Sequence, residues 1–318
     1  MKNKIFFCLP SFSSNPNLSN LKLDARVDVV VAEQREKALV ELANLHADTR
    51  ILVVGIEERV DEPLVQRLQN ITTVCTMSTG VDHIDVEALE RRNVQLIRLP
   101  GANATSVAEH IMMFALLHSR DYPGASEAVK NGLERSGLRF CPRDLSRRRI
   151  GLIGAGAVGR ELIRLLGPFH CEILVHTLHP DLHRDLCADD ISFVSKAQVF
   201  SDADIVSLCL PLTADTQGYV GHREVSLLRP GVILINTGRR ELISPQGERA
   251  LIENSQLRVG VDQLGLGGSE LLLEMGSRIA ATPHIAGATY DARRRMEDEM
   301  LAKVESVLRT RDTPACTP

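Results

Sequence analysis

The part of this chain that most constrains its fold is a glycine-rich turn between an apolar strand pattern and an amphipathic helix pattern. The turn lies within residues 151–159, which read GLIGAGAVG. Residues 150–153 are typical of a buried strand, and residues 161–166 place apolar side chains at helical spacing before Gly167-Pro168 ends the helix. Short glycine motifs also occur in ordinary turns, but this order of strand, turn and helix predicts a dinucleotide-binding site.

Each glycine of the turn has a separate expected role. Gly154 permits the sharp turn, Gly156 lets the backbone approach a pyrophosphate, and Gly159 lets the helix pack closely on the strand. Ala157 and Val158 would begin the helix, whose unpaired N–H groups and positive end would face the anion. We therefore expect these five residues to bind the cofactor.

The composition is typical of an α/β enzyme with two domains. With 318 residues, 44% of them hydrophobic, the chain is long enough to bury two cores. No apolar run reaches membrane-spanning length, and we interpret Ile5 to Leu9 as a first strand rather than a signal peptide. The net charge of −4 offers no basic surface for nucleic acid. We expect neither a membrane nor a nucleic acid as a partner.

The seven cysteines are an odd number and include no Cys-X-X-Cys pair. They predict neither a disulfide framework nor a zinc site, and we see no other cluster of metal-ligand residues in the sequence. Reduced thiols are typical of a cytoplasmic protein, which is the location that we expect.

Strand and helix patterns alternate along the chain, which predicts parallel sheets with helices on both faces. In the first hundred residues, strand-like segments at 27–31 and 51–55 are separated by helical patterns at 37–45 and 62–69. A small α/β domain is therefore expected there.

A second series of strand patterns follows the glycine turn and predicts a doubly wound sheet. Its members are residues 172–176, 203–210, 232–236 and 258–261. Before the turn, residues 106–119 form a long apolar helix pattern, which we expect to be capped by Ser or Thr and buried between domains or subunits. Residues 290–309 predict an amphipathic helix that packs on the N-terminal domain.

Several motifs, in order along the chain, resemble the D-2-hydroxyacid dehydrogenase family from about Val74 to the last helix. Besides the glycine turn, they are STGVDHID at 78–85, VAEH at 107–110, ADIV at 203–206, PLT at 211–213, NTGR at 236–239 and TPHIAG at 282–287. The segment TMSTG at 76–80 is similar to the glyoxylate/hydroxypyruvate reductase branch.

The resemblance implies an α/β fold with two doubly wound domains. Residues 1–100 plus 288–318 would form a flavodoxin-like substrate domain, into which a Rossmann cofactor domain, residues 101–287, is inserted. The active site would lie in the cleft, and the protein would be a homodimer.

The resemblance also implies site residues whose chemistry suits the roles. Arg239 follows a predicted strand, and its guanidinium can grip a carboxylate and polarise a 2-oxo group. His284 would be the general acid that protonates the developing alkoxide as hydride arrives from the nicotinamide. Backbone N–H groups near Ser78, Thr79 and Gly80 would hold the substrate carboxylate. A surface arginine, a loop histidine and a plain turn are the alternatives.

Further residues are expected to bind the cofactor. They are Pro211, Thr216, Thr237 and Asp262, of which Asp262 matches a family aspartate near the nicotinamide ring and has a loop cap as its alternative. Thr177 stands where an acid would bind the ribose of NAD. Because nothing there repels a 2′-phosphate and His179 could attract one, the sequence permits NADP and slightly favours it over NAD.

Two positions depart from the family pattern. Family members usually carry a glutamate five residues beyond the aspartate that Asp262 matches, where it orients the histidine and raises its pKa, but Gly267 stands there. Glu270 is the nearest carboxylate in sequence and is our candidate replacement, if a rearranged loop brings it to His284; an exposed glutamate is the alternative. Arg240 stands where the family usually has glycine; it would be strained at a positive φ, and it either re-aims the pocket toward a second anionic group or points to the surface.

Three functional hypotheses follow. The first is an NAD(P)-dependent oxidoreductase that reduces a small 2-oxo acid such as glyoxylate or hydroxypyruvate to the D-2-hydroxy acid. The second is the same scaffold with altered chemistry on a specialised metabolite, which Gly267 and Arg240 would mark. The third is a non-catalytic module that binds a nucleotide, against which the presence of both Arg239 and His284 argues.

Overall fold

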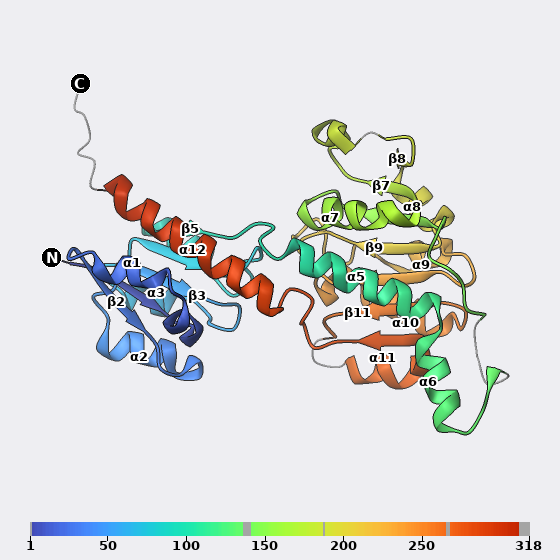
Figure 1. Ribbon diagram of the computed structural model, residues 1–318, viewed down its shortest axis with the longest axis horizontal. Coiled ribbons are helices and arrows are strands. Elements are labelled where there is room, and N and C mark those ends of the chain that lie inside the picture. Colours follow the sequence, from blue (N-terminus) through green and yellow to red (C-terminus); the bar gives the residue numbers. More distant parts are fainter. Residues whose placement is uncertain (1, 136–140, 187, 265–267, 312–318) are drawn as a thin grey trace. The chain divides into compact units, whose positions relative to one another are not determined.

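The computed structural model describes residues 2–135, 141–186, 188–264 and 268–311. The chain divides into two compact units (Figure 1). The first takes in the chain up to Ala102 together with the chain from Tyr290 on, and the second is Asn103–Thr289. Each unit is built on its own parallel sheet.

The first unit has a five-stranded sheet with strand order β2-β1-β3-β4-β5. Its strands are β1 (Asn3–Phe7), β2 (Val27–Val31), β3 (Ile51–Val54), β4 (Thr73–Thr76) and β5 (Gln95–Ile97), and all paired neighbours are parallel. From β1 the chain goes to one side for β2 and returns to the other side for β3. This order is the doubly wound, flavodoxin-like one.

Helices cover both faces of this sheet because successive residues of a strand point to opposite sides. Phe7 packs in one apolar cluster and its neighbour Phe6 in another. The helices are α1 (Leu18–Leu23), α2 (Ala38–Leu45), α3 (Glu62–Arg67), α4 (Val86–Arg91) and α12 (Tyr290–Arg311), with the 3₁₀ turns η1 (Pro10–Ser14) and η2 (Arg35–Lys37).

The last helix, α12, packs on the Phe7 face, where it lies across the sheet as the red helix of Figure 1. Met296, Met300 and Val304 join that cluster. The side-chain amide of Asn15 also donates to Asp298 at 3.1 Å. The predicted partnership between the C-terminal helix and the N-terminal domain is confirmed.

The second unit has a seven-stranded parallel sheet with strand order β12-β11-β10-β9-β6-β7-β8. Its strands are β6 (Arg149–Ile153), β7 (Glu172–His176), β8 (Ile191–Phe193), β9 (Ile205–Leu208), β10 (Ile233–Asn236), β11 (Arg258–Val261) and β12 (Ile279–Ala281). The chain fills one half of the sheet from β6 to β8 and the other half from β9 to β12. Both sheets are therefore doubly wound, as the sequence predicts.

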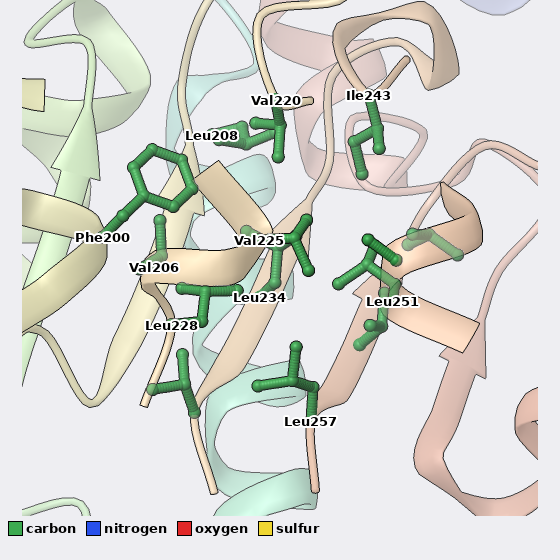
Figure 2. Packing of buried hydrophobic residues seen from close by; sticks show 14 of the residues in the cluster. Phe200, Val206, Leu208, Val220, Val225, Leu228, Leu234, Ile243, Leu251 and Leu257 are labelled. Carbon is green, nitrogen blue, oxygen red and sulfur yellow. The ribbon is translucent and has the colours of Figure 1, made fainter. Parts of the chain in front are cut away.

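Two apolar clusters fill the two faces of this second sheet. Figure 2 shows one of them, to which separate elements contribute Phe200, Leu234 and Leu251. The other joins Ile111 of α5 and Leu162 of α7 to the opposite face. The helices are α5 (Ala104–Ser119), α6 (Tyr122–Lys130), α7 (Ala157–Leu166), α8 (Lys196–Asp202), α9 (His222–Leu227), α10 (Pro245–Glu253) and α11 (Gly268–Met275), with the 3₁₀ turns η4 (Gly167–Phe169), η5 (Pro180–Leu186), η6 (Arg240–Leu242) and η7 (Gly276–Arg278).

The predicted Ser or Thr cap of α5 is wrong. The helix begins at Ala104, its N-cap residue is Asn103, and no side chain caps it by a hydrogen bond. Ser106 lies inside the first turn, where its hydroxyl is 2.9 Å from the hydroxyl of Thr289. The apolar character of α5 is explained by its packing on the sheet of its own unit.

Two further properties bear on the expectations from composition. Among the helices that the structure describes, none is long and apolar enough to cross a membrane.

The five described cysteines, Cys8, Cys75, Cys141, Cys171 and Cys209, carry free thiols. Burial raises the pKa of Cys75 to about 12 and that of Cys209 to about 11, so both stay protonated at neutral pH.

Candidate active site at the carboxyl ends of the second sheet

The carboxyl ends of the strands of the second sheet meet at one edge, because all the strands are parallel. Residues predicted from the sequence follow six of these ends. They are Gly154 and Gly156 after β6, Thr177 and His179 after β7, Pro211 after β9, Thr237 and Arg239 after β10, Asp262 after β11 and His284 after β12. Open α/β sheets bind their ligands at this edge, at the point where the strand order reverses, which here lies between β6 and β9.

The glycine turn has the geometry that the sequence predicts. Gly154 has a φ of +105°, and a Cβ atom there would lie 2.6 Å from the carbonyl oxygen of Cys209. A Cβ on Gly159 would lie 2.6 Å from the carbonyl oxygen of Gly154, so any larger residue would push helix from strand. In contrast, a Cβ on Gly156 would meet nothing within 4 Å. The backbone at Gly156 therefore faces open space.

This open space suits a dinucleotide. Gly156 is the N-cap residue of the ten-residue helix α7, and no side chain caps that end by a hydrogen bond. The N–H groups of the first turn, which includes Ala157 and Val158, and the positive end of the helix are therefore available to a pyrophosphate. The residues present fit a nicotinamide dinucleotide.

Asn236 fixes the backbone that carries Arg239. This asparagine is 3% exposed, and its side-chain amide donates to the carbonyl oxygen of Arg239 at 2.8 Å. Its Oδ1 accepts the N–H of Gly238 at 3.0 Å. The asparagine therefore closes the turn after β10 and sets where the arginine leaves it.

Asp262 fixes the backbone of the loop that carries His284. Its carboxylate is fully buried and accepts the N–H groups of Ile285 and Ala286, each at 2.8 Å, and the hydroxyl of Thr282 at 2.6 Å. Its carbonyl oxygen accepts the N–H of His284 at 2.5 Å. The carboxylate thus caps the loop, which was the alternative to its predicted contact with the cofactor; that contact stays a prediction.

The Asp262 loop holds His284 in an unusual conformation. The backbone φ of His284 is 58°, in the left-handed region that residues other than glycine rarely adopt. Such conformations persist where the surroundings enforce them, and they are common at functional sites. With the backbone held so, Nε2 of His284 lies 3.5 Å from Nη1 of Arg239. The structure therefore brings the two predicted catalytic side chains together.

A residue of α5 also reaches this loop. Nε2 of His110 lies 2.9 Å from the hydroxyl oxygen of Thr282 and 3.7 Å from Oδ1 of Asp262. Burial lowers the pKa of His110, although the carboxylate of Asp262 acts in the opposite direction. The sequence marked His110 only as part of the VAEH motif and gave it no role.

The other residues predicted to bind the cofactor lie at the same edge. Thr237 is 8% exposed. The hydroxyl of Thr216 donates to the carbonyl oxygen of Pro211 at 2.6 Å and accepts the N–H of Thr213 at 2.7 Å. Its hydroxyl is thus occupied in holding the loop after β9, and the cofactor roles of these residues stay predictions.

The first residue after β7, where a carboxylate would bind the ribose of NAD, is Thr177. The hydroxyl of Thr177 accepts the N–H of His179 at 3.4 Å. Further on, Nη2 of Arg160 in α7 lies 3.0 Å from Oδ1 of Asp185 and 2.9 Å from Nδ1 of His183. These contacts hold η5 to the helix that follows the glycine turn.

In the first unit, Ser78, Thr79 and Gly80 form the turn after β4. The hydroxyl of Ser78 donates to the carbonyl oxygen of Gly80 at 2.6 Å, and that of Thr79 donates to the carbonyl oxygen of Leu99 at 3.2 Å. In the part of the chain that the structure describes, the N–H groups of Thr79 and Gly80 donate to no protein acceptor. The side chains shape this turn, and two donors remain for an anion.

The two departures from the family pattern have different outcomes. Gly267 and the side chain of Glu270 lie outside the described residues, so the replacement of the missing glutamate stays a prediction. The condition for strain at Arg240 is not met, because this residue begins η6 and its φ is not positive. Its guanidinium binds Glu248 through two hydrogen bonds of 2.8 and 2.9 Å.

Comparisons with known proteins point to one family. The model of the family "D-isomer specific 2-hydroxyacid dehydrogenase, NAD binding domain" matches residues 112–286. The chain is 26% identical over 286 residues to a hydroxypyruvate reductase of Thermotoga maritima, covering 86% of this chain and 89% of that protein. It is 26% identical over 310 residues to a glyoxylate reductase of Pyrococcus furiosus, covering 94% and 90%.

The fold is also shared with solved structures. An acyclic imino acid reductase in complex with NADPH and D-Arg superposes with a TM-score of 0.80 at 23% identity. The match covers 96% of this chain and 97% of that one. At this level of identity, the match supports the fold alone.

Proposed function

Since this chain belongs to the D-isomer specific 2-hydroxyacid dehydrogenase family, we propose that it reduces a small 2-oxo acid, of the glyoxylate or hydroxypyruvate kind, to the D-2-hydroxy acid. The observation that carries the proposal is the approach of Arg239 and His284 to 3.5 Å at the carboxyl edge of the sheet. A reduced nicotinamide dinucleotide, when bound, supplies the hydride for this reaction.

The two side chains divide the remaining chemistry. The guanidinium of Arg239 binds the substrate carboxylate and polarises the 2-oxo group, since its planar fork presents several donors in one direction. His284 donates a proton from its ring to the oxygen that becomes the hydroxyl. In the first unit, the N–H groups of Thr79 and Gly80 support the predicted binding of a carboxylate by that turn.

The proposal is tested by following NADH and NADPH oxidation with glyoxylate, hydroxypyruvate, pyruvate and bulkier 2-oxo acids. Wild type should reduce at least one small acid, and His284→Ala and Arg239→Ala should each lose about 100-fold or more in kcat/KM. His222→Ala and Arg249→Ala are matched controls, because both side chains are exposed. Turnover that survives in both site variants would contradict the assigned roles.

For the cofactor, we propose that NADPH is used in preference to NADH. Thr177 offers no carboxylate that would repel a 2′-phosphate, and His179 follows two residues later. Thr177→Asp should raise the KM for NADPH about 10-fold and lower that for NADH, because the new carboxylate repels the phosphate and accepts the ribose hydroxyls. Thr177→Asn is the uncharged control. A variant that shifts neither KM would contradict this preference.

The absence of the usual glutamate favours a second candidate, the reduction of an imine formed from a 2-oxo acid and an amine. Gly267 stands where the family glutamate would pair with His284, and its own side chain supplies no carboxylate. An iminium already carries its proton, so its reduction to an amine needs none from a general acid. Repeating the acid panel with added ammonium or methylamine tests this candidate: turnover that needs the amine supports it, and turnover of the acid alone favours the first.

We also propose that the protein is a homodimer and is cytoplasmic. Apolar side chains are exposed on α5 and α6: Met113 by 40%, Leu116 by 39%, Tyr122 by 63% and Val129 by 74%. Surfaces of this kind are typical of contacts between proteins. Light scattering should give about twice the chain mass of 35.0 kDa, and a monomer at micromolar concentration would contradict the dimer.

A further inference from the structure

We propose that His110 is a positioning residue for the loop that carries His284. Nε2 of its ring donates a hydrogen bond to the hydroxyl oxygen of Thr282, which lies in that loop. The inference rests on the proposed function, since it concerns the residue assigned as general acid. It adds α5 to the elements that hold the site.

The direction of the hydrogen bonds follows from counting protons at Thr282. A threonine hydroxyl has one proton, and that of Thr282 is donated to the Asp262 carboxylate at 2.6 Å, since an ionised carboxylate only accepts. The ring nitrogen of His110, 2.9 Å from the same oxygen, must therefore be the donor. This assigns the ring proton to Nε2, and a neutral ring is sufficient, in agreement with the lowering of its pKa by burial.

The position of the His110 ring is set by the helix and not by the loop. Its ring meets that of Phe114, one turn further along α5, edge to face at a centroid distance of 4.8 Å. Phe114 in turn fills the space over Gly260 of β11, where a Cβ would come within 2.7 Å of the Phe114 ring. The position of Nε2 of His110 relative to the sheet is therefore set by these contacts and does not depend on the hydrogen bond with Thr282.

The hydrogen bond from His110 acts on the loop that carries His284. Asp262 uses Oδ1 for both Thr282 and Ile285 and Oδ2 for Ala286, so one carboxylate spans the residues on both sides of His284. Because His110 donates to the hydroxyl oxygen of Thr282, the hydroxyl proton is directed toward the carboxylate of Asp262. His284 is held at a positive φ by the contacts of Asp262 on both sides of it. Weakening the contact between Thr282 and Asp262 should therefore allow the His284 ring to move from its place beside Arg239.

The test compares two substitutions of His110. His110→Phe keeps a ring against Phe114 but has no donor, and His110→Gln keeps an N–H at a similar reach. His110→Phe should lower kcat about 10- to 100-fold, the typical effect of a displacement of about 1 Å, while the Kd for NADPH stays within about twofold. His110→Gln should retain most of the wild-type kcat. His222→Phe is the matched control on an exposed helix position.

Two further readouts distinguish positioning from general loss of structure. Amide hydrogen exchange at Ile285 and Ala286 should be faster in His110→Phe, but unchanged in peptides from the first unit. Thr282→Val breaks the same chain from the other side, so the double variant His110→Phe/Thr282→Val should lose no more kcat than either single variant.

Several results would overturn the inference. They are a wild-type kcat with wild-type exchange in His110→Phe, equal losses in His110→Phe and His110→Gln, and multiplicative losses in the double variant. If no 2-oxo acid is turned over by wild type, the proposed function fails, and the exchange experiment alone decides whether His110 holds the loop. If wild type is active and exchange is unchanged, only the inference on His110 fails.

Discussion

Two buried polar side chains hold the backbone on either side of the candidate site. Asn236 closes the turn before Arg239, and Asp262 caps the loop around His284. Both side chains bind backbone N–H groups that are buried or part-buried, so removing either would leave these donors without their acceptors, at a cost of about 1 to 3 kcal/mol each. The geometry of the catalytic pair is therefore set by residues that need not touch the substrate.

At Arg240, the observed contact favours a structural role over substrate recognition. Its guanidinium and the Glu248 carboxylate are partly buried and bound through two hydrogen bonds, which raises the pKa of the arginine further. Arg240→Gln should leave the relative kcat/KM for glyoxylate and dicarboxylic 2-oxo acids within about twofold and lower the free energy of unfolding by about 1 kcal/mol.

Glu248→Gln is the matched variant for this prediction, and should give a similar loss of stability. Chemical unfolding and steady-state kinetics on both variants provide the comparison. A selective loss of dicarboxylic substrates in Arg240→Gln would instead support the hypothesis that Arg240 binds a second anionic group.

At the scale of elements, α5 is joined to β11 by polar contacts as well as by packing. Nε2 of His118 lies 2.9 Å from the carbonyl oxygen of Val259, and Arg258 donates to the carbonyl oxygen of His118 at 2.6 Å. His118 is 1% exposed, and burial lowers its pKa to about 4. The helix end thus depends on an uncharged histidine.

This histidine should make the stability of the second unit depend on pH. An unfolded chain binds the proton near pH 6.5, whereas the folded chain does so only near pH 4, so stability present above pH 6.5 is lost as the pH falls through this window. The loss should reach about 3 kcal/mol in wild type. His118→Gln, whose amide can still donate to Val259, should lack this component.

Denaturant unfolding followed by circular dichroism at pH 7 and pH 4.5 measures the difference between the two proteins. The exposed His222→Gln serves as a control that should follow wild type. Parallel loss of stability in wild type and His118→Gln would contradict a buried neutral histidine.

The sequence predicts well the long amphipathic C-terminal helix and several strands rich in β-branched residues. Strands β2, β7 and β11 have the expected bounds, and α12 extends only two residues beyond its prediction. In contrast, β8 and β12 are three residues each, too short for a pattern to be distinguished from a loop. The cap of α5 was missed because Asn103 precedes two competing candidates, Thr105 and Ser106, and its side chain makes no capping bond.

For the whole molecule, the glycine turn and the alternation of elements predict the doubly wound second sheet and a small α/β first domain, and the family resemblance implies the doubly wound order of the first sheet. The place of Arg239 at this edge follows from the predicted strand before it, whereas the place of His284 is implied only by the family resemblance, since β12 is too short to be recognised from a pattern. The contact of His110 with Thr282 does not, since it joins residues 172 positions apart and depends on the register of α5 over β11. Local patterns carry no information on that register.

The measurement that tests the central claim most directly is the identity of the product formed from hydroxypyruvate and NADPH. We expect D-glycerate in equal molar amount to the NADPH oxidised, with formation abolished in His284→Ala and retained in the exposed variant His222→Ala. Formation of L-glycerate, or no glycerate from an enzyme that demonstrably binds NADPH, would contradict the reduction of this 2-oxo acid at the Arg239 and His284 site.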